Sequence, residues 1–205
     1  GSEMCIRDRR KGQLENRELG KATDWLDLST RVGSIQDYQV SISGSAPKVN
    51  YYLSTSYSDN AGIVVGDDFD RFSMLGKMKT NVTNWLEVGV DAAYSRSDYS
   101  GNAANISEAY KMSPYGVNYR DEENKLIEKY PTGQSHGHPL WGVDDDTRYN
   151  SDIRNNYRLG VNVLVKIPWI KGLTYRMNYM GNWELSTGKN FITERSCLLY
   201  TSDAA

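Results

Sequence analysis

Few side chains in this sequence combine the type and the spacing that metal binding requires. His136 and His138 form a His-x-His pair in a polar stretch that we expect to be an exposed loop, but the chain has only two histidines and two cysteines. Both cysteines lie at the far ends of the chain, so the usual four ligands of a structural zinc site are not available. The run Asp144–Asp146 offers oxygen ligands of the kind that calcium prefers, without the spacing of an EF-hand loop. We therefore predict no metal and no cofactor.

Paired carboxylates are the next candidates for chemistry, and Glu87 and Asp91 are the best placed pair. Four residues along an extended strand separate them by roughly 13 Å, whereas glycosidase carboxylates lie within about 9.5 Å of each other. The sequence also has no nucleophile elbow, no Ser–His–Asp order and no glycine-rich phosphate loop. We expect a protein that is not an enzyme, with these two carboxylates on a polar wall.

Loop aromatics are the remaining candidates for ligand contact. A long polar connection between two extended segments carries several of them, and an aromatic ring there can stack on a sugar or pack on a partner protein. Each ring can equally pack the loop against itself, and Asn102, Asn105 and Arg120 offer hydrogen bonds nearby. The candidate ligand-binding residues are Tyr115, Tyr119, Tyr130 and Trp141.

The elements that must position these residues follow from an alternation of apolar and polar side chains. Between residues 86 and 95, Leu86, Val88 and Val90 alternate with Glu87, Gly89 and Asp91. Successive side chains of a strand point to opposite faces, so this period of two predicts a strand with one apolar face. We expect six such strands, at about 36–44, 48–58, 70–82, 85–97, 153–167 and 173–187.

Charge follows the same alternation. The expected apolar faces carry no charged residue, while the opposite faces carry Lys77, Lys79, Glu87, Asp91, Arg158, Lys166, Arg176 and Glu184. A charge that faces lipid at mid-bilayer costs roughly 2–4 kcal/mol for Arg or Lys, whereas the lumen of a barrel tolerates it. The pattern is therefore typical of a transmembrane barrel wall.

The connections alternate in length as well. Short turns fall at Ser45–Pro47, Thr83–Asn84 and Pro168–Gly172, whereas Asp59–Asp70 and the segment from Tyr99 to about Asp152 are long, with a short helix expected at Ile106–Met112. Short turns at one rim and long loops at the other are typical of outer-membrane barrels. We predict an all-β fold of antiparallel up-and-down strands that form part of a transmembrane β-barrel. Threaded in this way, the strands give two aromatic girdles: Tyr57, Phe72, Tyr94, Tyr157 and Trp183 near the long loops, and Tyr51, Trp85 and Trp169 near the short turns.

Two other architectures fit an alternating pattern. A soluble β-rich carbohydrate-binding or adhesive module would bring its apolar faces together across a core. A small closed barrel would need its first and last strands to pair, and 36–44 has no evident complement in 173–187. The net charge of −2 and the lack of a basic cluster argue against nucleic acid as a partner.

Several motifs occur in a characteristic order along the chain. They are Thr23-Asp24-Trp25, Gln39–Gly44, Asn50-Tyr51-Tyr52, Asn60–Val64, Phe69–Ser73, Asn84–Gly89, Tyr94–Ser97, Met112-Ser113-Pro114, His138-Pro139-Leu140 and Ile170–Leu173. Over roughly residues 14–194, this order and spacing resemble the barrel of SusC/RagA-type TonB-linked outer-membrane transporters.

The resemblance implies a large barrel of about 22 strands, with an N-terminal plug domain and TonB box that this chain lacks. It implies the outer membrane of a Gram-negative cell and import of oligosaccharides, or of peptides in some members, driven by the TonB complex. It also implies a SusD-like surface lipoprotein that caps the extracellular mouth. Glycans are the substrate class that we expect, and transport would need the missing plug.

Both ends of the chain differ in character from its interior. Residues 1–10 (GSEMCIRDRR) and 196–205 (SCLLYTSDAA) resemble translated sequencing-adapter remnants, and they contain both cysteines, Cys5 and Cys197. We expect these ends to be non-native and leave them out of the fold. The interior then offers no disulfide and no thiolate ligand.

Overall fold

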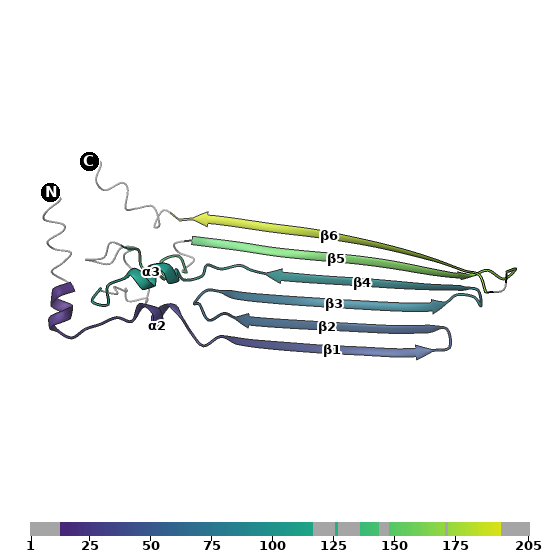
Figure 1. Cartoon of the computed structure of the whole chain (residues 1–205), viewed down its shortest axis with the longest axis horizontal. Coiled ribbons are helices and arrows are strands. Elements are labelled where there is room, and N and C mark those ends of the chain that lie inside the picture. The colour runs from purple at the N-terminus through teal and green to yellow at the C-terminus, as the bar shows by residue number, and fades with distance from the viewer. Residues whose placement is uncertain (1–12, 117–125, 127–135, 144–147, 171, 194–205) are drawn as a thin grey trace.

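The chain folds into one long antiparallel sheet. The computed structural model describes residues 13–116, 126, 136–143, 148–170 and 172–193. The six strands follow one another across the sheet in sequence order (Figure 1). Their bounds are β1 Ser34–Ala46, β2 Val49–Ala61, β3 Asp68–Asn81, β4 Leu86–Asp98, β5 Arg148–Lys166 and β6 Thr174–Ile192. The expected fold class is confirmed, and all six expected strands are present.

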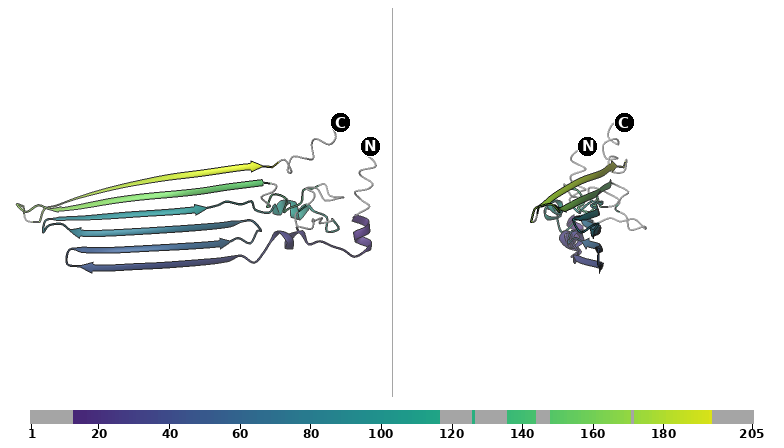
Figure 2. Two further views of the ribbon diagram at one scale, coloured as in Figure 1. Left: turned by 180° about the vertical axis from the view of Figure 1, so that it is seen from behind. Right: turned by 90° about the vertical axis from the view of Figure 1, so that its right-hand side faces the viewer.

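The two ends of the sheet differ. The turns after β1, β3 and β5 gather at one end, which we call the turn end (Figure 2). The β2–β3 and β4–β5 connections gather at the other, the loop end, together with α2 (Trp25–Ser29) and α3 (Ile106–Lys111). The expected short helix is therefore confirmed as α3. The expected asymmetry between turns and loops is also present.

One loop is shorter than the sequence indicates. The prediction of a loop over Asp59–Asp70 was wrong, because β2 and β3 continue pairing as far as Ala61 opposite Asp68. Beyond that pair, Gly62 N donates to Asp67 O at 2.7 Å and closes the connection. Backbone pairing thus extends through polar residues that carry no apolar alternation.

The register of the sheet aligns the alternating residues of all six strands. One row of directly opposed residues runs Ile42, Leu53, Gly76, Ala92, Leu159, Gly181. The next row toward the loop end on the same face runs Val40, Thr55, Met74, Tyr94, Tyr157, Trp183. We call this the apolar face and the opposite one the polar face. A one-residue slip in any pairing would exchange the two faces of the slipped strand.

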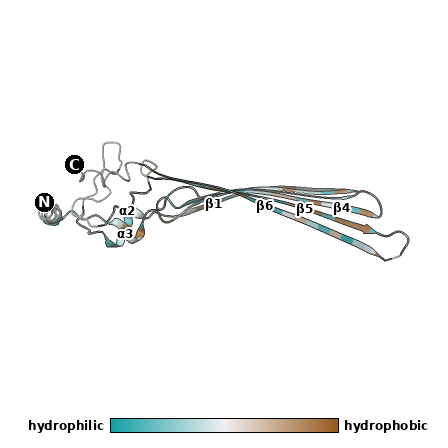
Figure 3. Ribbon diagram, turned by 90° about the horizontal axis from the view of Figure 1, so that it is seen from above, coloured by the Kyte–Doolittle hydropathy of each residue, from teal (hydrophilic) through white to brown (hydrophobic). Residues whose placement is uncertain are grey.

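Charge is absent from most of the apolar face. From the row of Leu86 and Val165 to the row of Tyr94 and Tyr157, the strand positions on this face carry no charged residue. The charged strand residues of this face all lie nearer the loop end: Asp59, Asp68, Asp70, Arg96, Asp98 and Lys189. Figure 3 shows apolar and polar residues alternating along the strands. We call the uncharged rows the apolar band.

Among the described residues, no second layer covers either face of the sheet. Apolar side chains of the band are largely exposed, for example Val40 at 70% and Tyr179 at 62%. Within the part of the chain that the structure describes, β1 and β6 each pair on one side only. The apolar faces therefore do not meet across a core, as a sandwich would require, and the first and last strands do not close a small barrel. None of the described helices is long and apolar enough to cross a bilayer.

A cross-linking experiment tests this register. With Cys5 and Cys197 changed to Ser, cysteines at Ala92 and Leu159 lie directly opposite each other. They are close enough for a disulfide, since opposed Cα atoms of an antiparallel pair are about 4.5–5.5 Å apart. We expect mild oxidation to cross-link this pair almost completely, read by mass spectrometry of a tryptic digest. The control pair, cysteines at Ala92 and Arg158, lies on opposite faces and should cross-link poorly. The register would be wrong if the control pair cross-linked the faster.

Candidate functional site

The polar face is a wall of hydrogen-bonding side chains. One row across it runs Gln39, Ser56, Ser73, Ser95, Asn156, Glu184, and the row beside it begins with Ser41 and Ser54. Basic residues outnumber acidic ones on this face. The basic residues are Arg71, Lys77, Lys79, Arg148, Arg154, Arg158, Lys166 and Arg176, and the acidic ones are Asp37, Glu87, Asp91, Asp152 and Glu184.

The two carboxylates weighed for catalysis are parts of this wall. Glu87 Oε1 lies 2.8 Å from Lys79 Nζ across the β3–β4 pairing. Asp91 lies directly opposite Lys77 and accepts a hydrogen bond from Asn162 Nδ2 at 3.3 Å. Each carboxylate is thus matched with a cation or an amide on a neighbouring strand, which is the structural role that the spacing of the two residues predicts.

The loop end contains the only buried cores among the described residues. Asp24 begins α2 by accepting hydrogen bonds from the backbone N–H groups of Leu26 and Asp27 at 3.0 and 3.1 Å. Trp25, 3% exposed, packs with Ala109 of α3 and Met112. Its indole Nε1 donates to Ser113 O at 2.8 Å. This packing fastens the segment before β1 to the β4–β5 connection.

A second cluster continues this core toward the sheet. Its buried members are Ala104, Leu126, Leu140 and Trp141, and Leu28, Val64, Val65 and Val143 pack against them. Backbone bonds tie the parts together: Val65 N donates to Ser29 O at 3.1 Å, and Ala104 N donates to Val65 O at 2.8 Å. We call residues 23–30, 62–67, 102–116 and 136–143 the loop unit, since the segment before β1 and the β2–β3 and β4–β5 connections fold there as one body.

The loop unit contains two of the four predicted ligand-binding residues. Trp141 is 7% exposed and belongs to the second cluster. Tyr115 is half-buried, and its carbonyl oxygen accepts a hydrogen bond from Asn16 Nδ2 at 2.9 Å. Tyr119 and Tyr130 lie outside the described residues, as does Arg120. Ligand contact by these residues stays a prediction.

The two asparagines considered beside them have local roles. Asn105 caps α3, with its side-chain oxygen accepting from Glu108 N at 3.2 Å. Asn102 Nδ2 donates to Arg148 O at 2.9 Å and so links the loop unit to the start of β5. Both side chains therefore stabilise the loop unit.

The histidine pair is divided between surface and core. The expectation that both lie on an exposed loop was wrong for His138, which is 4% exposed and meets the Trp25 ring edge-on at 5.2 Å between centroids. Its Nδ1 accepts from Leu140 N at 3.1 Å. His136 Nδ1 lies 3.3 Å from Glu108 Oε2. Within the described ranges no three His, Cys, Asp or Glu residues are placed to hold a metal, and Asp144–Asp146 fall outside those ranges.

One group of side chains on the polar face at the loop end is not among the candidates that the sequence indicates. The rings of Phe69 and Tyr99 lie 4.7 Å apart between centroids. The guanidinium carbon of Arg71 lies 5.3 Å from the Phe69 centroid, and that of Arg154 lies 4.9 Å from the Tyr99 centroid. We call these four residues the arginine–aromatic cluster. The alternation alone indicates that Phe69 and Arg71 share a face, but only the cross-strand register brings Tyr99 and Arg154 beside them.

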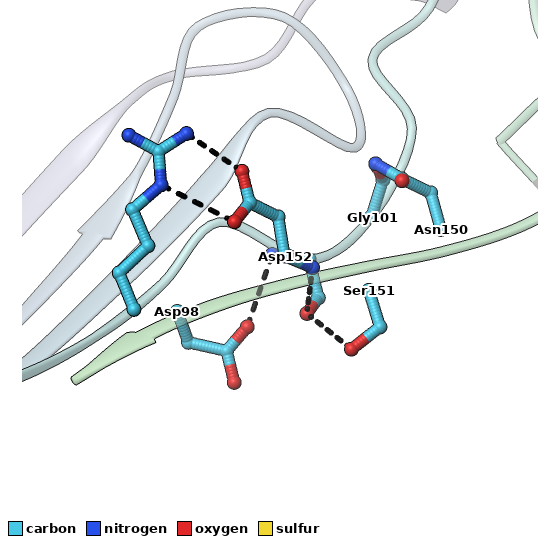
Figure 4. A network of polar contacts seen from close by, with 7 residues as sticks. Asp98, Gly101, Asn150, Ser151 and Asp152 are labelled. Atoms are coloured by element: carbon cyan, nitrogen blue, oxygen red, sulfur yellow. Dashed lines mark hydrogen bonds and ion pairs between the residues drawn. The ribbon is translucent and has the colours of Figure 1, made fainter. Parts of the chain in front are cut away.

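Asp152 anchors one side of this cluster. Its carboxylate accepts two hydrogen bonds from Arg154, at 3.2 Å from Nε and 2.8 Å from a terminal nitrogen (Figure 4). Its backbone N–H donates to Ser100 Oγ at 3.2 Å, and Ser100 N donates to Asp98 Oδ1 at 3.0 Å. The hydrogen bond from Arg154 holds the pKa of Asp152 below its usual value. The Asp152 carboxylate therefore stays ionised and holds the Arg154 guanidinium in place.

An acidic row borders the apolar face just beyond the apolar band. Asp59, Asp70 and Asp98 oppose one another on adjacent strands. Burial and the neighbouring charge of Asp59 raise the pKa of Asp70 above its usual value. Arg96 lies 3.5 Å from Asp98 and partly offsets the negative charge. The apolar face thus ends in a charged rim at the loop end.

Comparison with known proteins agrees with the predicted resemblance. The chain is 26% identical over 197 residues to TonB-dependent receptor P3 of Formosa agariphila, which covers 90% of this chain. It is 29% identical over 110 residues, 52% of this chain, to TonB-dependent receptor SusC of Bacteroides thetaiotaomicron. The chain spans 17% of the length of the first relative and 11% of the second. No family model matches the chain.

Solved structures agree with the fold. A RagAB peptide importer in a closed-closed state matches 80% of this chain with a TM-score of 0.57 and 19% identity, over 20% of that chain. A RagAB peptide transporter matches 78% of this chain with a TM-score of 0.59 and 20% identity, over 18% of that chain. The resemblance to SusC/RagA-type TonB-dependent transporters is confirmed, and the sheet corresponds to a portion of such a barrel.

Substituting Trp25 tests whether the loop unit is one body. Trp25→Ala removes a buried ring, and such truncations cost about 3–5 kcal/mol. We expect faster proteolytic cleavage within residues 99–147, measured by limited proteolysis of the folded protein. Trp25→Phe loses the bond to Ser113 O and part of the ring volume but keeps an aromatic ring in the core, and it should have a smaller effect.

The matched control is Trp169→Ala. Trp169 is 90% exposed, and its removal should leave cleavage of the loop unchanged. Equal protease sensitivity of the Trp25→Ala and Trp169→Ala variants would contradict the loop unit as a cooperative body.

Proposed function

We propose that this chain is a wall segment of the barrel of a TonB-dependent outer-membrane importer of oligosaccharides that acts with a SusD-like surface lipoprotein. The observation that carries the proposal is the register, which places an uncharged apolar band on one face and charged, hydrogen-bonding side chains on the other across all six strands. In a barrel of this kind the apolar face contacts lipid and the polar face lines the lumen.

The height of the apolar band suits a bilayer. On β4 the band extends over residues 86–94, roughly 27 Å along the strand. A strand tilt of about 40° reduces this length to about 21 Å, near the roughly 25 Å apolar belt of outer-membrane barrels. Aromatic rings border it at the loop end, where Tyr94 lies 6.4 Å from Phe72 and 5.1 Å from Tyr157 between centroids.

The two ends of the sheet give the orientation of the barrel. Outer-membrane barrels have short periplasmic turns and longer extracellular loops. The turn end, with Tyr51, Trp85 and Trp169 nearby, therefore faces the periplasm. The loop end and the loop unit face outward, where a surface lipoprotein would meet them. Tyr115, half-buried at this end, is the described loop aromatic that we propose for contact with ligand or lipoprotein.

The open edges of the sheet agree with a larger barrel. Unpaired backbone groups cost several kcal/mol each in hydrocarbon, so a membrane sheet must close. The outer edges of β1 and β6 have no partner among the described strands, and the chain spans 17% of the length of its relative from Formosa agariphila. Further strands, the plug and the TonB contact would be supplied by the rest of such a receptor.

The polar face supports glycans as the substrate class. Serine hydroxyls, asparagine amides and charged groups cover it, and these groups donate to and accept from sugar hydroxyls. One relative of this chain is SusC. Glu87, Asp91 and Asp152 on the same face are engaged by neighbouring cations and amides, so we propose that the segment contributes a passive wall.

Uptake by intact cells tests the proposal. A strain that expresses the complete receptor and its lipoprotein should accumulate fluorescent oligosaccharides, and deletion of TonB should abolish this accumulation. Uptake that persists without TonB would contradict the transport mechanism. Uptake of peptides with no uptake of any oligosaccharide would contradict the substrate class.

A pair of adjacent substitutions tests the assignment of the faces. Val161 lies on the apolar face and Asn162 on the polar face. Val161→Arg should destabilise the barrel by about 2–4 kcal/mol, because it exposes a cation to mid-bilayer lipid. Asn162→Arg should cost far less, because its side chain enters the lumen.

The measurement is urea unfolding of the receptor in phospholipid vesicles, followed by tryptophan fluorescence. The lipid-facing assignment fails if Asn162→Arg is the more destabilising of the two.

A further inference from the structure

The arginine–aromatic cluster holds the guanidinium of Arg71 in a fixed position on the polar face. The Arg71 guanidinium carbon lies 5.3 Å from the Phe69 ring centroid, and Nε donates to Ser97 Oγ at 3.4 Å. A cation above an aromatic face is stabilised by the ring quadrupole. The long side chain is therefore oriented before any ligand binds. This reduces the loss of side-chain entropy on binding.

The two arginines of the cluster differ in their partners. Arg154 is engaged by Asp152 through two hydrogen bonds. Arg71 forms no ion pair with any carboxylate of the described residues, and Ser58 and Ser97 are its direct neighbours across the sheet. The nearest acidic position in its row is Asp37, two strands away. The terminal N–H groups of Arg71 are thus available to an anion.

The surroundings of Arg71 define what kind of anion fits. A planar guanidinium binds a carboxylate through two parallel hydrogen bonds. Tyr99 is 41% exposed, and its ring offers an apolar edge to a ligand. The half-buried hydroxyl of Ser58 flanks the cation in the same row, while Ser97, 4% exposed, is already engaged by Arg71 Nε. Carboxylate, apolar ring face and hydroxyls occur together in a uronic acid residue.

We propose that the arginine–aromatic cluster binds a uronate residue of an acidic oligosaccharide at the extracellular mouth of the lumen, with Arg71 holding the carboxylate. This inference rests on the proposed function, because it places the polar face inside a glycan importer. The basic excess on the polar face agrees with an anionic substrate. The ion pair of Arg154 with Asp152 keeps the second guanidinium as a support for the Tyr99 ring.

The experiment uses the complete receptor with its lipoprotein in detergent, and a pair of probes that differ only in charge. One probe is a pool of oligosaccharides from pectin, alginate and chondroitin digests. The other is the same pool with its carboxyl groups reduced to alcohols. We expect Arg71→Gln to weaken binding of the acidic pool at least tenfold, measured by microscale thermophoresis, and to leave binding of the reduced pool within twofold. Arg71→Lys keeps the charge without the planar fork and should recover part of the loss.

The matched control is Lys79→Gln, on the same strand and the same face. Lys79 is already paired with Glu87, so its substitution should change binding of either pool less than twofold. Unchanged binding of the acidic pool by Arg71→Gln, equal losses for both pools, or no binding of the acidic pool would each overturn the inference. TonB-dependent uptake of neutral oligosaccharides would persist in those cases, so the proposed function would stand. If TonB-dependent uptake of neutral oligosaccharides were also absent, the proposed function itself would be contradicted.

Discussion

The cross-strand register is the constraint on which the rest of this structure depends. Apolar and polar side chains alternate along each of the six strands, but this alternation by itself gives only six separate strands, each with an apolar and a polar face. Direct opposition of residues such as Ala92 and Leu159 joins these strands into one surface with an apolar and a polar side. A slip by one residue would place Asp91 or Arg158 within the apolar band. The strand register therefore decides which side chains share a face, and the separation of apolar from polar side chains in turn favours this register.

Stability in this chain is unevenly distributed. The strands are held by backbone pairing and by lateral contacts within each face, while burial is concentrated in the loop unit around Trp25 and Trp141. A sheet with both faces open and two free edges is a liability in water, because its edges and apolar surface invite association. In the proposed barrel, lipid on one side, the lumen on the other and further strands at both edges would together resolve that liability.

The sequence predicts the sheet better than the site. Alternation of apolar and polar residues, as at Leu86–Asp91, is a local signal. This signal located all six strands. The strand ends near Asp68 and Arg148 were missed, because pairing there extends through polar residues without alternation. The helix α2 is too short for a periodic pattern, and its cap at Asp24 is its main local signal.

The loop end depends on contacts between distant segments. His138 packs against Trp25, and Phe69 packs against Tyr99. Both contacts join segments that are far apart in the sequence, so a local pattern cannot predict them. The side chains of the polar wall could be assigned to a face from sequence, but their partners across strands could not.

The central claim is that the apolar face contacts lipid while the polar face contacts water. The most direct measurement is site-directed spin labelling of the complete receptor in phospholipid vesicles, with labels at Val161 and Asn162, read as relative accessibility to oxygen and to a water-soluble nickel complex. The account predicts that the label at Val161 is accessible to oxygen and shielded from nickel, and that the label at Asn162 shows the reverse. A nickel-accessible label at Val161 in the folded receptor would contradict the account.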